Sequence, residues 1–224
     1  MPTRTGACAL IALLSLTVGR AALEAASPDE PKGYVQPALV LTVQPAGIAN
    51  HRVFPPISGT AVGVAAVGGA FVGRTLAVES EAVVGQPVTT PQHFSYNWSE
   101  QFIGENRDVF LGANVRWAPG AARHLELVGG GGIAFSTFAE RSIIRTDGVF
   151  PPHTITPLDD RVETARQLVL SGGVATPLPI NRRIALVPAF TVRWVRRSSD
   201  GLGAYSGVGS YVYQVGCGVR FKIP

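Results

Sequence analysis

The residues of this chain that could do acid–base or nucleophilic chemistry are few. Glu79 and Glu81 stand two positions apart, a spacing that brings two carboxylates to one face of an extended strand and would suit acid–base catalysis. His124 and Ser136 lie on one extended segment but are 12 residues apart, too far for a base to activate a nucleophile. Because strand alternation accounts for the carboxylate pair without any chemistry, we predict no catalytic residue and no enzyme.

Metal, thiol and phosphate chemistry are also poorly supported. His51, His93 and His153 lack a second His or Cys at metal-ligand spacing. Cys217 follows Gly216 with no activating base nearby, so it is interpreted as a small apolar surface residue. The glycine run 129–132 is not followed by Lys and Ser or Thr, as a phosphate-binding loop would be. We therefore predict no metal and no cofactor.

The composition indicates a protein that contacts something other than water. The chain has 224 residues, of which 46% are hydrophobic and 15% charged, against about 25% charged in typical soluble domains. That length suits one domain. The net charge of +4 comes without a basic run, which argues against nucleic acid as a partner.

The first segment, residues 1–26, is interpreted as a signal peptide. Arg4 precedes an apolar stretch from Ala7 to Val18, and small residues follow, which is the order of an export signal. The apolar stretch is shorter than the roughly 20 residues of a membrane-spanning helix. We expect cleavage near Ala21 or Ala25, which leaves residues 27–224 as the exported domain.

The elements that must position the polar residues are extended strands. Beyond the leader, Gly and Pro interrupt almost every window, and apolar residues recur with period two. We predict eight strands at 34–44, 58–71, 75–85, 107–118, 123–138, 163–177, 183–197 and 207–223. The first is the weakest, because Pro37 interrupts it. A strand of about 10 residues, tilted about 40°, rises about 25 Å, the height of the apolar band of an outer-membrane barrel.

Alternation along these strands separates two faces. One face is apolar, and the other carries a predicted lumenal polar network of Glu79, Glu81, Asp108, Asn114, Arg116, Glu126, Arg193, Gln214 and Arg220. An eight-stranded barrel is just wide enough for its side chains to fill it, so buried charges there are expected to pair. Aromatic residues near strand ends suit an interface girdle, predicted as Trp117, Trp194, Tyr211, Tyr213 and Phe221.

Connections between the predicted strands alternate strictly in length. Short ones lie around 72–74, 119–123 and 178–182, and long ones around 45–57, 86–106, 139–162 and 198–206. This pattern is typical of an up-and-down antiparallel barrel with tight turns at one end and projecting loops at the other.

The chain resembles the small eight-stranded outer-membrane β-barrel proteins of Gram-negative bacteria, which are OmpA/OmpX-like in architecture. The resemblance is carried by the leader, by Leu76-Ala-Val-Glu-Ser-Glu-Ala, by Leu127-Val-Gly-Gly-Gly-Gly-Ile-Ala, by Val169-Leu-Ser-Gly-Gly-Val-Ala and by Tyr213-Gln-Val-Gly-Cys-Gly-Val-Arg-Phe. It implies an outer-membrane location after export, short periplasmic turns, long extracellular loops, membrane lipid as a partner and the barrel-assembly machinery as a partner during insertion. Members usually end on an aromatic residue, whereas here Lys222-Ile223-Pro224 follow Phe221.

Three functions stay open at this point. The first is a non-enzymatic barrel that serves envelope structure or surface interaction. The second is a narrow pore or a lumenal small-ligand site in the same barrel. The third is a soluble periplasmic, lipocalin-like barrel, which would require the opposite arrangement of polar and apolar faces.

Overall fold

The structure is a computed structural model that describes residues 31–45, 58–96, 98–119, 124–145, 155–157, 161–197 and 210–224. The predicted signal peptide, residues 1–26, lies outside this range, as does most of the predicted loops 45–57 and 198–206. The described residues form strands and turns, and they include no helix that could cross a membrane.

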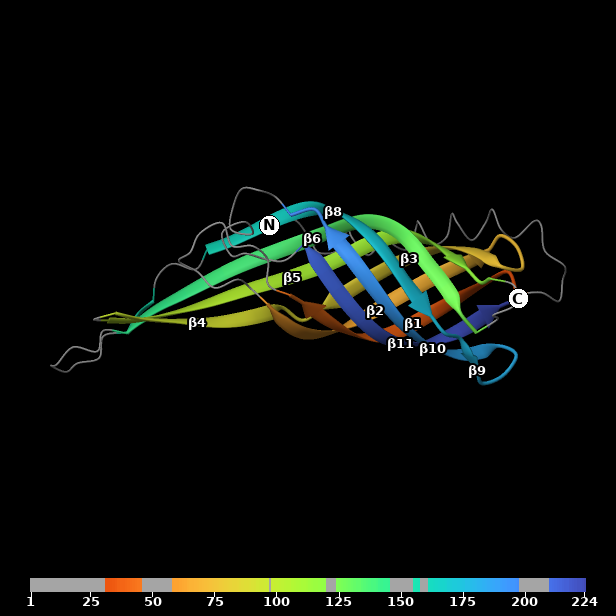
Figure 1. The fold of residues 1–224 in the computed structure, drawn as a ribbon, viewed down its shortest axis with the longest axis horizontal. Helices are drawn as coiled ribbons and strands as arrows, with labels where there is room; N and C mark the ends of the chain where they lie inside the picture. Colours follow the sequence, from red (N-terminus) through yellow and green to blue (C-terminus); the bar gives the residue numbers. More distant parts are fainter. Residues whose placement is uncertain are drawn as a thin grey trace.

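Eight antiparallel strands form a closed barrel (Figure 1). They are β1 (Gly33–Gln44), β2 (Gly59–Phe71), β3 (Leu76–Gly85), β5 (Trp98–Trp117), β6 (Glu126–Arg145), β8 (Arg161–Ala175), β10 (Ile184–Val195) and β11 (Tyr211–Ile223). Pairing of β5 with β6 and of β1 with β11 completes the ring. The predicted all-β, eight-stranded antiparallel barrel is confirmed.

Strand β1 closes the barrel despite Pro37. On one side it pairs with β2 through Pro37 itself, which lies opposite Ala66. On the other side the ladder with β11 leaves out Gln36 and Pro37 and resumes at Ala38, opposite Gly218. Because proline has no N–H to donate, a gap in one ladder is the least costly way to place it within a barrel strand.

The two faces of the barrel wall differ sharply in polarity. Large apolar side chains point outward and remain exposed, such as Leu39 (67%), Val64 (57%) and Leu170 (55%). Inward-facing Glu79, Arg116 and Arg220 are almost fully buried. This polarity is the reverse of a soluble protein, where apolar side chains gather inside.

An apolar layer crosses the lumen towards the loop end of the barrel wall. Each of the eight barrel strands contributes one buried residue to it: Val40, Ala65, Val83, Phe110, Ala134, Val169, Val195 and Val212. Sequence reasoning predicted a polar lumen and did not find this layer. It follows from the same alternation, because these residues share the inward phase of the charged ones.

The prediction of a loop at residues 86–106 is wrong. Residues Val88–Tyr96 form β4, which pairs with the first half of β5 as a hairpin. The β5–β6 ladder also continues to Arg145, within the predicted loop 139–162, and is joined by the short β7 (Ile155–Pro157). Strands β4, β5 and β6 therefore project well beyond the barrel wall (Figure 1). Valine, threonine and aromatic residues favour strands. The extended ladder also pairs backbone N–H and C=O groups that would bind only water in an irregular loop.

The opposite end of the barrel is built from short turns. Val72 donates its backbone N–H to the Leu76 carbonyl at 2.9 Å. Between β8 and β10, β9 (Leu178–Pro179) pairs with β10, and the Asn181 side chain accepts two backbone N–H groups at 2.8 Å. Of the third predicted turn, residues 120–123 lie outside the described range.

Candidate functional site

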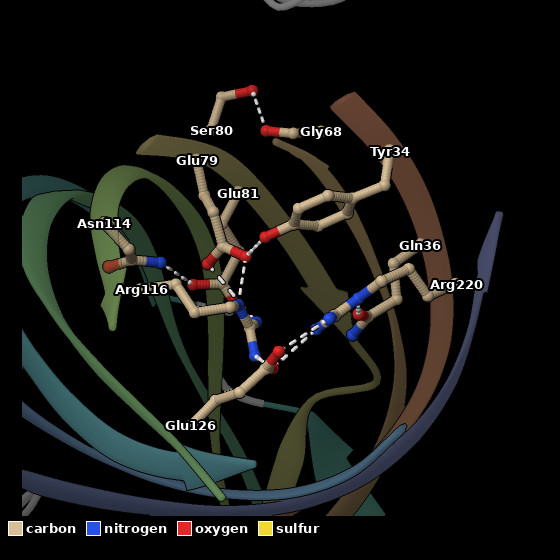
Figure 2. A network of polar contacts seen from close by, with 10 residues as sticks. All are labelled: Tyr34, Gln36, Gly68, Glu79, Ser80, Glu81, Asn114, Arg116, Glu126 and Arg220. Atoms are coloured by element: carbon tan, nitrogen blue, oxygen red, sulfur yellow. Dashed lines mark hydrogen bonds and ion pairs between the residues drawn. The ribbon is translucent and has the colours of Figure 1, made fainter. Parts of the chain in front are cut away.

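A cluster of charged and polar side chains fills the lumen on the short-turn side (Figure 2). We call it the turn-end cluster; its members are Tyr34, Gln36, Glu79, Arg116, Glu126 and Arg220. They come from β1, β3, β5, β6 and β11, which lie far apart in the sequence. Since all of them occupy inward positions near strand ends, closure of the barrel is what brings them together.

Glu126 holds the turn-end cluster together by bridging two arginines. Arg220 donates to both of its carboxylate oxygens, each at 2.8 Å, and Arg116 donates to Oε2 at 2.7 Å. Arg220 also donates Nε–H to Gln36 at 3.0 Å. Bidentate arginine–carboxylate pairs are among the strongest ionic contacts in proteins.

Glu79 completes the cluster from β3. Arg116 donates to both oxygens of Glu79, and the Tyr34 hydroxyl donates to Oε1. The Arg220 guanidinium lies 4.5 Å from the centre of the Tyr34 ring, a cation–π distance. Every nitrogen of both arginine head groups therefore has a partner.

A second ionic group lies next to the apolar layer. Glu81 accepts from Arg193 at 2.7 Å and from Asn114 at 3.0 Å, and Asn114 in turn accepts from Ser171 at 2.9 Å. The Arg193 guanidinium stacks over the Phe110 ring at 4.4 Å. Its Nε and Nη1 atoms have no hydrogen-bond partner among the described residues.

A third group lies on the loop side of the apolar layer. Arg197 donates to both oxygens of Asp108, at 2.9 and 3.3 Å, and also to Gln167 and Ser136. Nearby, Asn106 donates to Gln44 at 2.9 Å. On the neighbouring wall Gln214 donates to Thr42 at 3.0 Å.

Two small cavities interrupt the packing of the lumen. The loop-end cavity has a volume of about 40 Å³ and is lined by Gln44, Asn106, Arg193 and the apolar layer. The other, of about 60 Å³, lies between Glu81, Asn114 and Arg116. A wider chamber of about 680 Å³ opens at the short-turn mouth, where Arg116, Glu126 and Arg220 are among its lining residues. Its size suits solvent or a ligand, but the turn-end cluster separates it from the rest of the lumen.

All nine residues predicted for the lumenal polar network point inward. Glu79, Arg116, Glu126 and Arg220 meet in the turn-end cluster, while Glu81, Asn114 and Arg193 form the second group. Asp108 and Gln214 lie elsewhere, bonded to Arg197 and Thr42.

Sequence reasoning missed several members of these groups. Tyr34, Gln36 and Gln44 are inward residues of β1, the strand that the sequence predicts most weakly, and its two faces were not assigned. Arg197 keeps the inward phase of Arg193, four residues earlier, although it lies just beyond the end of β10. Extending the alternation to every strand would have found all of them.

The five predicted girdle residues occupy outward positions at the two ends of the wall. Trp117 (47% exposed) and Phe221 (41%) lie near the short turns. Tyr211 (52%), Tyr213 (37%) and the half-buried Trp194 lie towards the loops, where Trp194 pairs with Tyr211. Phe190 stacks on Tyr213 with ring centres 6.5 Å apart.

Two findings concern the metal-ligating and thiol side chains in the part of the chain that the structure describes. No three His, Cys, Asp or Glu side chains there lie close enough together to hold a metal ion. Cys217 is a free, exposed thiol on the outward face of β11.

No protein-family model and no curated protein sequence matches this chain. Solved structures with a similar fold include Ail, the attachment invasion locus protein of Yersinia pestis (9% identity, TM-score 0.49, 86% of this chain and 99% of that one). A major outer membrane protein from Thermus thermophilus is also similar (13%, 0.49, 84% and 99%), as is the outer membrane protein OprG from Pseudomonas aeruginosa (12%, 0.45, 86% and 97%). At this identity the likeness concerns the fold and says nothing about ligand or activity.

Proposed function

We propose that this protein is a non-enzymatic integral β-barrel of the outer membrane of a Gram-negative bacterium. We propose also that it reaches this membrane after signal-peptide export. One observation carries the proposal: the barrel turns its large apolar side chains outward and its ionic groups inward. In water this arrangement would expose a continuous apolar wall, which soluble monomers rarely do. In a bilayer the same wall faces acyl chains.

The dimensions of the apolar wall support this placement. On β5 the outward positions from Val109 to Trp117 carry no charge. Nine residues at about 3.3 Å each, tilted about 40°, span about 23 Å, close to the roughly 25 Å apolar band of outer-membrane barrels. Girdle residues Trp117 and Tyr211 then fall near the two lipid–water interfaces. Membrane lipid is thus the main partner, and the barrel-assembly machinery is the partner during insertion.

A lumen filled by side chains supports a structural or surface role over a pore. The turn-end cluster and the apolar layer each cross the interior, and the two cavities that border the apolar layer or the cluster are small. Planar-bilayer conductance separates the two functions. A closed barrel gives no discrete current steps, whereas regular steps would establish the narrow-pore alternative.

The projecting hairpins favour contact with other molecules at the cell surface. β4 and β7 form the two edges of the sheet that extends beyond the barrel. Each carries a proline, Pro91 opposite Ile103 and Pro157 opposite Ile143. Proline on an edge strand removes a donor and discourages pairing with further strands. The faces of this sheet, rather than its edges, are therefore the proposed contact surface.

Membrane fractionation combined with gel migration tests the location. Folded protein in detergent should migrate differently before and after heating, and it should remain in the membrane pellet after a carbonate wash. Complete release by carbonate would contradict integral insertion. It would favour the soluble lipocalin-like alternative.

A further inference from the structure

Three exposed arginines form a band on one side of the outer wall, at its loop end. Arg107 on β5, Arg166 on β8 and Arg196, just beyond β10, are all exposed. Each occupies the next outward position on the loop side of the apolar wall. The last apolar wall residues on the three strands are Val109, Leu168 and Trp194, respectively. We call these three residues the arginine band.

The arginine band is confined to neighbouring strands. β5, β6, β8 and β10 lie side by side (Figure 1), and the register places Arg166 opposite Phe135 and Arg107 opposite Thr137. The backbone N–H of Arg196 binds the Leu168 carbonyl. The register places Arg196 level with Leu111 on β5, four residues from Arg107. With strands about 4.8 Å apart and a rise of about 3.3 Å per residue, the three positions spread over about 20 Å of the wall, within reach of the long arginine side chains around one large headgroup.

The opposite side of the wall has no comparable charge. The corresponding outward positions on β1, β2 and β3 are Pro45, Thr60 and Gln86. On the arginine side the acidic outward residue Glu105 stands two positions beyond Arg107, further from the apolar wall. The cations therefore border the apolar wall directly, and the acid does not.

Among the described residues, no ion pair or side-chain hydrogen bond involves the guanidinium group of Arg107 or Arg196. Arg166 contacts the Phe135 ring, with its guanidinium carbon 5.9 Å from the ring centre. The lumenal arginines, by contrast, are paired with carboxylates. Arginines at the edge of an apolar wall lie at the same depth in the membrane as the lipid phosphates. Guanidinium groups bind phosphate in bidentate geometry.

We infer that the arginine band binds the phosphate groups of a lipid headgroup in the outer leaflet. This inference rests on the proposed membrane location. It further specifies the class of lipid bound and the side of the barrel that binds it. The occupant is a lipid with phosphate on a bulky headgroup, because three separated cations match more than one anionic group. Such binding would hold this lipid against the β5–β10 side of the barrel and restrict rotation of the barrel relative to the bound lipid.

Lipid retention in native mass spectrometry tests the inference. The full-length exported protein is reconstituted with diphosphoryl or monophosphoryl lipid A and extracted in mild detergent. Wild type should retain the diphosphoryl form preferentially. The triple variant R107Q/R166Q/R196Q should lose about a hundredfold in retention, from about fivefold per arginine.

A matched control removes the same charge at the other end of the barrel. Arg74, Arg182 and Arg183 are exposed residues of the short turns, so R74Q/R182Q/R183Q should keep retention within about twofold of wild type. Equal loss in both triple variants, or no preference for the diphosphoryl lipid in wild type, would overturn the inference. Heat-dependent migration of the same samples reports insertion: inserted protein without lipid A retention refutes this inference alone, and failure to insert refutes both proposals.

Discussion

The turn-end cluster and the loop-end cavity satisfy buried charge in different ways. In the cluster every head-group nitrogen of Arg116 and Arg220 has a protein acceptor. Beside the cavity, Arg193 keeps one carboxylate contact while Nε and Nη1 have none among the described residues. Gln44 Nε2 and Asn106 Oδ1, which line the same cavity, are also without partners there.

The difference indicates which buried polar atoms need water as a partner. A buried polar atom without a partner costs about 1–3 kcal/mol, so four such atoms around one space imply that water binds them. The cavity volume of about 40 Å³ exceeds the roughly 10–15 Å³ that one water needs. The turn-end cluster is thus an ionic plug whose arginine head groups are satisfied by protein acceptors, whereas the loop-end cavity has polar atoms that need water as a partner.

The largest expected effect comes from breaking the plug. Glu126→Gln leaves Arg116 and Arg220 without their shared carboxylate, and loss of one partner in a buried ionic network costs about 3–5 kcal/mol. Urea unfolding in lipid vesicles should show a correspondingly lower midpoint. Glu105→Gln, at an outward and partly exposed position, is the control and should change stability by less than about 0.5 kcal/mol. Equal effects of the two variants would show that the cluster is not a stabilising plug.

A steric change should disturb the same cluster less. A Cβ atom on Gly69 would collide with the ring and hydroxyl of Tyr34, which must then move away from Glu79. We expect Gly69→Ala to destabilise the barrel by about 2–3 kcal/mol. Gly172→Ala is the matched control, because no atom lies within 4 Å of its added Cβ. An unchanged unfolding midpoint for Gly69→Ala would mean that Tyr34 has room to move.

The smallest of these effects is expected beside the loop-end cavity. Arg193→Gln removes one ion pair, but Glu81 keeps its hydrogen bond from Asn114 and lines the cavity of about 60 Å³. We expect a loss of about 1 kcal/mol, against about 3 kcal/mol or more for Arg116→Gln in the plug. The two variants are compared in the same unfolding experiment. Equal costs for Arg193→Gln and Arg116→Gln would contradict this difference between the two regions.

Much of the fold was predictable because period-two alternation survives along every barrel strand. Val109, Leu111 and Val115 point outward while Asp108 and Arg116 point inward, as the alternation on β5 predicts. Strand ends were less accurate: β11 begins at Tyr211, four residues after the predicted start. Local pattern cannot fix where a ladder stops, since that depends on the neighbouring strand.

Partners within the lumen were not predictable from the sequence. Alternation places Glu126 and Arg220 inside, but their contact depends on the register between strands that are 94 positions apart. The β4–β5 hairpin was also missed, because polar residues such as Gln92 and His93 resemble loop composition. These residues form a strand because they pair with the extended first half of β5.

The orientation of Cys217 allows the central claim, an apolar exterior in contact with lipid, to be measured directly. Its exposed side chain lies mid-wall, opposite exposed Leu39 on β1. The protein without the predicted signal peptide, residues 1–26, which contains the other cysteine, Cys8, is labelled at Cys217 with a small fluorophore and placed in vesicles. It is compared with C217S/I180C, whose labelled position is 66% exposed in a short turn. The account predicts that lipids brominated along their acyl chains quench the label at position 217 strongly and the label at position 180 weakly. Quenching of position 217 by aqueous iodide, with no response to the brominated lipids, would contradict it.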